Sequence, residues 1–216
     1  TINNIGLIYQ RMRYYELAEE SIRTGLRISD SLKYEAGRVY SLRRLAALYI
    51  AQQKYDEAAK FYDEIVTSYK KRNEKSGLAQ LYNDFGLIAE KKGDLLEARK
   101  FFEQSRDRSQ EIDDKFIESF ALLNLGRIER LTKEDKAGLT NLKKAQELAE
   151  RGAFSSILRD IYLELSKLYH ETGNVDEAFV YLTKHNDLKD SLLNETVLSS
   201  VGEMRIRYEM EKSNER

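Results

Sequence analysis

Small and apolar residues recur along this chain at a fixed spacing of forty residues. A small residue follows a large apolar one at Gly6, Ala46, Gly86, Gly126 and Ser166. Two further sets of positions repeat with the same spacing, and we call each such set a register. They are Ala18, Ala58, Ala98, Gly138 and Ala178, and Ile22, Tyr62, Phe102, Leu142 and Leu182. A constant period held over five copies is typical of stacked repeats, each too small to bury its apolar face alone.

Each repeat is predicted to contain two helices. Apolar residues such as Leu81, Phe85 and Ile88 follow the helical spacing, and Gly93 and Asp94 then provide a break and a cap for the next helix. Small residues on both helices let their axes approach to about 8–10 Å. The predicted helices are 1–11 and 14–30, 35–51 and 55–71, 75–91 and 95–112, 115–131 and 135–151, and 154–171 and 175–191. No long stretch alternates as a strand would, so the predicted fold class is all-α.

Residues 193–216 do not fit a further repeat. Val197, Val201, Met204 and Tyr208 are spaced four, three and four residues apart, which is a narrow seam rather than a broad core face. We expect a helix over about 194–210 that either caps the last repeat or leaves it as a linker. As a linker, its seam would allow weak pairing with a second chain, and hence a weak homodimer.

Composition narrows the possible functions. The 216 residues include no proline, cysteine or tryptophan, which excludes disulfides and thiolate sites. Charged residues make up 34% with a net charge of −1, which argues against a nucleic-acid binder. No membrane-spanning run or signal peptide is evident. Thr1 and the early position of Gly6 suggest that the sequence is a piece of a longer protein with a truncated first repeat.

The chain offers no combination of residues suited to catalysis. His170 and His185 are predicted on different helices, and the glycines form no phosphate-binding loop. Acidic pairs such as Asp113 and Asp114 suit turns and helix starts. We therefore expect no catalytic residues, no metal site and no cofactor, and the chain is not expected to be an enzyme.

The repeat resembles the tetratricopeptide repeat, whose pattern combines an apolar residue and a glycine with a tyrosine three residues later and small and aromatic residues on the second helix. Here the third copy reads Phe85, Gly86, Ala89, Ala98 and Phe102. The resemblance covers about residues 1–192 and departs from the family in its forty-residue period, against the usual thirty-four, in lacking the closing proline, and in a weak fourth copy. It implies a right-handed superhelical solenoid of antiparallel helix pairs over 1–192, with an extra helix over 193–216.

The family resemblance also implies where a ligand would bind. The first helices of such pairs line a concave face, where Asn commonly holds a peptide backbone and Lys or Arg a carboxylate. An Asn amide donates and accepts together, and an Arg fork suits a carboxylate. The positions predicted to bind a peptide are Asn3, Asn4, Arg43, Arg44, Asn83, Asp84, Asn124, Arg127, Arg130 and Lys167.

The expected function is peptide or protein binding as the sensory or scaffolding part of a bacterial signalling protein. This rests on a similarity of Leu188–Leu192 and Glu203–Lys212 to the linkers of repeat-containing bacterial sensor kinases and regulators. Two alternatives remain open: a stand-alone adaptor, and the peptide-pheromone receptor part of a transcription regulator. The sensor interpretation implies a periplasmic location, and the alternatives imply a cytoplasmic one.

Overall fold

The computed structural model describes the backbone of residues 2–214 and the side chains of residues 5–10 and 12–194. Within these residues every element is a helix and none is a strand, which confirms the all-α class. The chain divides into two compact units, unit 1 (Thr1–Ile117) and unit 2 (Glu118–Arg216). The boundary lies inside one helix, α7 (Lys115–Leu131). The predicted division into a solenoid over 1–192 and a tail stays a prediction.

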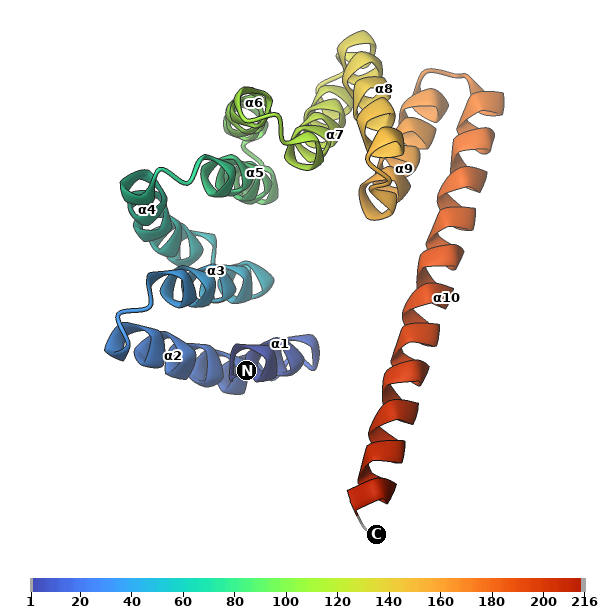
Figure 1. The fold of residues 1–216 in the computed structure, drawn as a ribbon. Helices are drawn as coiled ribbons and strands as arrows, with labels where there is room; N and C mark the ends of the chain where they lie inside the picture. The colour runs from blue at the N-terminus through green and yellow to red at the C-terminus, as the bar shows by residue number, and fades with distance from the viewer. Residues whose placement is uncertain (1, 215–216) are drawn as a thin grey trace. The chain divides into compact units, whose positions relative to one another are not determined.

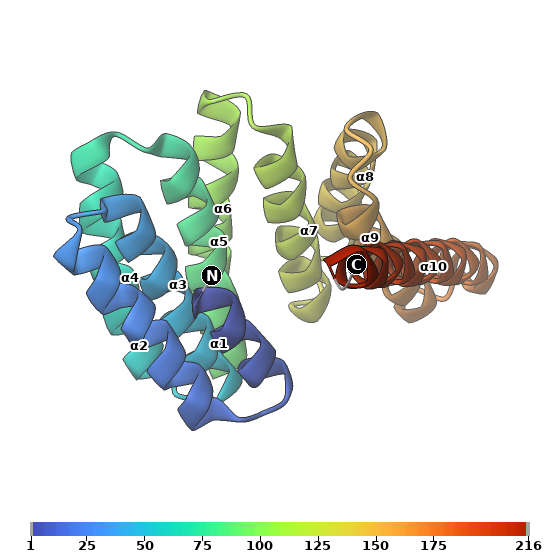
Figure 2. The ribbon, with the colours of Figure 1, turned by 60° about the horizontal axis from the view of Figure 1, so that its bottom comes forward.

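Unit 1 consists of three antiparallel helix pairs followed by the first residues of α7 (Figures 1 and 2). Each observed helix begins and ends within two residues of its predicted range, because the repeat fixes where the apolar stripe begins and ends. The pairs are α1 (Ile2–Arg11) with α2 (Tyr15–Ser31), α3 (Glu35–Ala51) with α4 (Tyr55–Arg72), and α5 (Lys75–Lys92) with α6 (Leu95–Glu111). We call the first helix of each pair its A helix and the second its B helix.

Unit 2 contains most of α7, followed by α8 (Asp135–Arg151), α9 (Ser155–Glu171) and α10 (Val175–Asn214). Its core is an apolar cluster in which Leu142 and Ala145 of α8 meet Ile161 and Leu165 of α9, with Tyr181 of α10. In unit 1 the corresponding cores join Ala18 and Ile22 of α2 to Leu45 and Leu48 of α3, and Tyr62 of α4 to Leu81 of α5. Each B helix of these clusters therefore packs against the A helix of the next pair.

The same turn joins every pair of consecutive helices. One residue per turn has a positive φ, and these residues are spaced twenty apart: Arg13, Lys33, Gln53, Asn73, Gly93, Asp113, Lys133, Ala153 and Gly173. The next residue donates its backbone N–H five residues back, as Asp94 does to Ala89 at 2.9 Å. This left-handed C-terminal motif satisfies the last helical carbonyls. Helices of about seventeen residues and short turns thus account for the forty-residue period. Glycine occupies the positive-φ position in only two of these turns, at Gly93, where a break was predicted, and at Gly173.

The predicted small-residue registers are contact points between paired helices. A Cβ on Gly86 would lie 2.8 Å from Cζ of Phe102, and one on Gly126 would lie 2.5 Å from Cγ of Leu142. Both distances are too short, so these two positions require glycine. In the last pair, Ser166 replaces the glycine and donates to the Ala178 carbonyl at 2.9 Å. These contacts confirm the packing assigned from the repeat.

The end of unit 2 differs from the expected separate tail helix. Helix α10 has 40 residues against 17 in α9, and it runs without a break past the end of α9 (Figure 1). No glycine or proline occurs between Val175 and Val201, so nothing in the sequence stops the helix at residue 192. The side chains of the predicted seam, Val197, Val201, Met204 and Tyr208, lie outside the described residues. Pairing through that seam stays a prediction.

None of the described helices combines the length and the apolar character that crossing a membrane would need.

Candidate functional site

One concavity formed by predicted site residues lies on the A-helix side of unit 1. It has a volume of about 330 Å³. Helix α3 supplies most of its lining, α4 contributes the buried Tyr62, and α5 contributes Asp84. The lining residues are Tyr40, Arg43, Arg44, Ala47, Ile50, Tyr62 and Asp84. We call this concavity the α3–α5 pocket. Three of the predicted site residues, Arg43, Arg44 and Asp84, line it together.

Arg43 joins α3 to α5 in this pocket. Its guanidinium donates to Gln80 Oε1 at 3.2 Å and to Asp84 Oδ2 at 3.4 Å, so both bonds are long. The side chains of Arg43 and Asp84 keep 37% and 26% of their surface exposed. Burial raises the pKa of Asp84 to about 6, and the charge and hydrogen bond of Arg43 offset only part of that effect. Burial and the Asp84 charge raise the pKa of the Tyr62 phenol as well.

Arg44 offers the pocket a second cation. Its guanidinium lies over the Tyr40 ring at 5.0 Å from the centroid and donates to the Tyr40 hydroxyl at 3.0 Å. Among the described residues, no carboxylate forms an ion pair with Arg44. The stacking fixes the direction of the guanidinium while leaving it half-buried. The pocket therefore holds one cation paired with Asp84 and one held only by a phenol.

In unit 2 the charges around Glu164, which corresponds to Asp84, bind one another. Arg130 is buried and donates from Nε to Glu164 Oε2 at 3.1 Å and from Nη1 to Glu171 Oε1 at 2.5 Å. Lys167 pairs with Glu164 at 2.7 Å, and Lys133 pairs with Glu171 at 2.9 Å. We call these five residues the Arg130 network. The side chains of Arg130 and Glu164 at its centre are only 10% and 6% exposed, so each of these two charges is compensated by its partners rather than by water.

Two of the residues predicted to bind a ligand lie in the interior of the protein. Asn83 and Asn124 are buried, with 1% and 0% of their surface exposed, so they are not accessible to a ligand. Arg43 and Arg44 occupy the same two registers in α3, where a longer side chain reaches the surface. The expected exposure of Arg130 is also wrong, because Glu164 and Glu171 enclose its guanidinium.

The other predicted positions lie in different environments. Arg127 and Lys167 are both half-buried, and Lys167 is paired with Glu164. The side chains of Asn3 and Asn4 lie outside the described residues. The prediction did not include Tyr40 or Tyr62, which complete the α3–α5 pocket. Tyr40 could have been found, since it precedes Arg44 by four residues and so shares its helix face.

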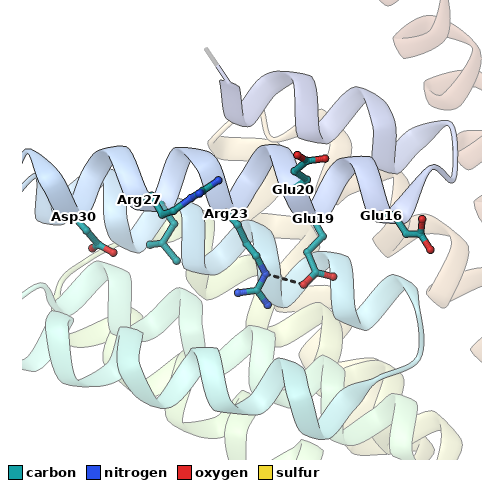
Figure 3. Close-up of a pocket in the computed structure, with 7 residues that line it drawn as sticks. Glu16, Glu19, Glu20, Arg23, Arg27 and Asp30 are labelled. Carbon is teal, nitrogen blue, oxygen red and sulfur yellow. Dashed lines mark hydrogen bonds and ion pairs between the residues drawn. The ribbon is translucent and has the colours of Figure 1, made fainter.

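A second concavity lies on a B helix, outside the predicted site. It has a volume of about 620 Å³, and its lining residues all belong to α2. These side chains project from one side of α2 along its length (Figure 3). Glu19 accepts from Arg23 Nε at 2.8 Å and from the Tyr49 hydroxyl at 2.9 Å, so the central charges already bind each other. The residues that line this concavity are Glu16, Glu19, Glu20, Arg23, Leu26, Arg27 and Asp30.

Metal-binding side chains do not converge in the part of the chain whose side chains are described: no group of three His, Asp or Glu residues there could hold an ion. The acidic pair Asp113 and Asp114 has the expected role in a turn. Asp113 has a φ of 56°, and Asp114 Oδ1 accepts the backbone N–H of Ile117 at 3.0 Å.

The fold and its packing registers match known repeat proteins. Three sequence models of the tetratricopeptide repeat match residues 1–31, 38–74 and 77–151. No curated protein matches the chain.

Several solved structures share the fold at low sequence identity. BtubC (BKLC) from P. vanneervenii has a TM-score of 0.73 and 16% identity, over 88% of this chain and 79% of that one. A signal transduction ATPase with numerous domains (STAND) from Pyrococcus horikoshii, which has a tetratricopeptide repeat sensor, gives 0.70 and 18%, over 90% of this chain and 30% of that one. The Rap conjugation gene regulator of plasmid pLS20, in complex with the Phr* peptide, gives 0.64 and 12%, over 90% and 63%.

These identities support a shared fold and nothing finer. The repeat models, together with the paired helices and the small-residue contacts, identify the family. The chain belongs to the tetratricopeptide repeat family.

Proposed function

We propose that the chain is a non-catalytic module that binds a peptide or protein, and that the ligand contacts the α3–α5 pocket of unit 1. The observation that carries this proposal is the Arg44 guanidinium, which is fixed by Tyr40, half-buried, and has no ion-paired carboxylate among the described residues. A guanidinium in such a place gains most from a carboxylate, which it can bind by two hydrogen bonds. The tetratricopeptide fold is generally a binding scaffold, which supports the same interpretation.

The surrounding residues suggest the shape of the ligand. Ala47, Ile50 and Tyr62 give the pocket apolar surface beside the two arginines. A ligand that carries a carboxylate next to an apolar side chain would satisfy both parts. Acidic side chains and chain-terminal carboxylates both meet this description.

For the whole protein, we propose a sensory or scaffolding role in bacterial signal transduction. The fold similarity to a STAND protein with a repeat sensor supports this. A stand-alone adaptor is an alternative. The peptide-bound Rap gene regulator favours a third possibility, a peptide receptor coupled to gene regulation.

The binding proposal is tested with an array of short peptides of varied sequence, each synthesised with a free C-terminal carboxylate and with a C-terminal amide. We expect the 216-residue chain to bind a subset of these peptides. Arg44→Ala should lower the affinity for that subset at least about tenfold, since a hydrogen bond to a charged group contributes about 1.5–3 kcal/mol. The matched control is Arg151→Ala, which removes an arginine that is 77% exposed on α8.

Two results would contradict the proposed site. Peptides that bind Arg44→Ala and the unsubstituted chain equally would exclude the α3–α5 pocket. Loss of binding in Arg23→Ala instead would place the ligand at the α2 concavity.

A further inference from the structure

Two lysines of unit 2 lie over tyrosine rings. Lys143 of α8 has its Nζ 4.5 Å from the centre of the Tyr181 ring and 5.8 Å from that of Tyr169. Lys184 of α10 has its Nζ 5.1 Å from the centre of the same Tyr181 ring and 5.6 Å from that of Tyr162. Both lysines are exposed, and neither forms an ion pair within the part of the chain whose side chains are described. We call these two lysines and three tyrosines the lysine–tyrosine cluster.

The tyrosines give the two ammonium groups a packed base. Tyr181 and Tyr162 are only 5% and 9% exposed, and the Tyr181 ring stacks on that of Tyr169 at 5.6 Å between centroids. The Tyr181 hydroxyl accepts from Lys143 Nζ and donates to Gln146 Oε1 at 3.4 Å. A cation over an aromatic face is attracted by the ring but keeps its full charge. The cluster therefore presents two positive charges at the surface of unit 2.

The two acidic residues in the last two turns of α8 have other partners. Glu150 accepts from Gln146 Nε2 at 2.7 Å and from the Tyr162 hydroxyl at 3.3 Å. Glu147 pairs with Arg151 at 2.8 Å. Neither carboxylate forms an ion pair with a lysine of the cluster, so both lysines can receive an acid from outside.

The first pair of helices in unit 1 shows what a cation in this position binds. Arg23 of α2 occupies the register of Lys143, and Tyr49 of α3 occupies that of the tyrosine on α9. In unit 1, Glu19 accepts from Arg23 Nε at 2.8 Å and from the Tyr49 hydroxyl at 2.9 Å. The residue at the Glu19 register in unit 2 is Leu139. The same combination of a cation and a tyrosine thus has its own carboxylate in unit 1 and an apolar residue in its place in unit 2.

We propose that the lysine–tyrosine cluster binds an acidic segment of a partner protein, whose carboxylates take the place that Glu19 has in unit 1. The charge of the two lysines is complementary to such a segment. Lysine is a point charge with rotatable donors, so the cluster requires acidic side chains rather than one fixed sequence. This inference does not rest on the proposed function, because the α3–α5 pocket lies in unit 1.

The binding is tested with an oligoglutamate peptide whose two ends are blocked, so that only side-chain carboxylates are offered. The protein is the full 216-residue chain carrying Arg44→Ala, which removes the charge proposed to bind carboxylates in unit 1. We expect isothermal titration calorimetry at low salt to detect binding of oligoglutamate and none of oligoglutamine. The affinity should fall as salt is added, because ions screen exposed charges.

Charge-removing variants locate the bound peptide. Lys143→Gln and Lys184→Gln should each lower the affinity for oligoglutamate about threefold, as the loss of one exposed charge pair does. The matched control is Lys189→Gln, which removes an exposed lysine from α10. Lys189 follows Lys184 by five residues and so lies on another side of the helix, and its loss should leave the affinity unchanged.

A second pair of variants restores the carboxylate of unit 1. Leu139→Glu places an acid at the Glu19 register, where it should pair with Lys143 and lower the affinity about threefold relative to Leu139→Gln. Leu139 is half-buried and packs against the core of unit 2, so circular dichroism must show that both variants fold. If they do not fold, the lysine variants decide the question.

Four outcomes would overturn the proposal. The first is equal binding, or no binding, of oligoglutamate and oligoglutamine. The second is an affinity for oligoglutamate that is the same in Lys143→Gln, Lys184→Gln and Lys189→Gln. The third is tighter binding of inorganic phosphate than of oligoglutamate, which would assign the cluster to a phosphoryl ligand. The fourth is self-association that Lys143→Gln abolishes, which would assign the cluster to a second copy of the chain.

Discussion

Asp84 of unit 1 and Glu164 of unit 2 occupy the same position in the repeat, eighty residues apart, yet the two units surround them differently. Asp84 is 26% exposed and receives one long bond of 3.4 Å from Arg43. Glu164 is 6% exposed and is bound by both Arg130 and Lys167. One carboxylate lines an open pocket, and the other lies within a neutralised network.

The two carboxylates differ in exposure because their arginine partners occupy different positions on the preceding A helix. Arg43 occupies a register that holds Leu123 in unit 2, while Arg130 lies two turns further along its helix and binds Glu171 as well. Equal register therefore does not imply equal exposure. A cation that pairs with two carboxylates closes a surface, and one that pairs loosely with a single carboxylate leaves it open to a ligand.

The largest expected effect is the loss of stability on removing the arginine of unit 2, and removing the arginine of unit 1 is the comparison. Arg130→Met should lower the free energy of unfolding by about 3–5 kcal/mol, because it leaves the buried Glu164 without its main partner. Arg43→Met should cost less than about 1 kcal/mol, because that ion pair is solvent-exposed in part. Urea unfolding followed by circular dichroism measures both. Equal losses in the two variants would contradict the distinction between the units.

A smaller effect concerns the pH dependence of unit 1. The pKa of Asp84 is about 6 in the folded chain and about 4 in an unfolded one. Between these values the folded state binds more protons, so this contribution to stability is complete below about pH 4 and is lost as the pH rises through about 6.

We expect Asp84→Asn to reduce the loss of stability between about pH 4 and about pH 7 by about 1–2 kcal/mol. This is less than a shift of two full pKa units would give, because the Asp84 side chain keeps 26% of its surface exposed. Urea midpoints from about pH 4 to about pH 7 test this. Glu147→Gln, at a side chain that is 57% exposed, is the control and should follow the unsubstituted chain. Parallel profiles for Asp84→Asn and the unsubstituted chain would show that Asp84 titrates as an ordinary carboxyl.

The smallest effect should be the same in both units. Gly93 and Gly173 have φ values of 88° and 82°, and an added Cβ would meet nothing within 4 Å at either. Each Gly→Ala substitution should therefore cost only the backbone strain of about 1–2 kcal/mol, at the lower end because neighbouring turns hold other residues in this conformation. Differential scanning calorimetry of the two variants checks this. A much larger cost in one unit would show that its turn differs from the others.

The helices and their packing could be predicted from the sequence because they depend on local spacing. Gly86 and Phe102 lie on paired helices at positions that repeat five times, and such redundancy identifies a contact. The turns were harder to predict. Lys133 and Ala153 adopt the same left-handed conformation as Gly93, but their residue types give no signal of it.

What the sequence determined by itself is the all-α repeat, the length of each pair and the faces that pack, because each follows from periodic burial of apolar side chains. Only the tertiary structure decided which polar residues at equal registers face solvent. Asn124 and Arg44 share a register, but the short amide is buried and the long guanidinium reaches a pocket. Exposure of a polar side chain depends on its length and on the partners that other helices bring to it, and neither is encoded in the period of the chain.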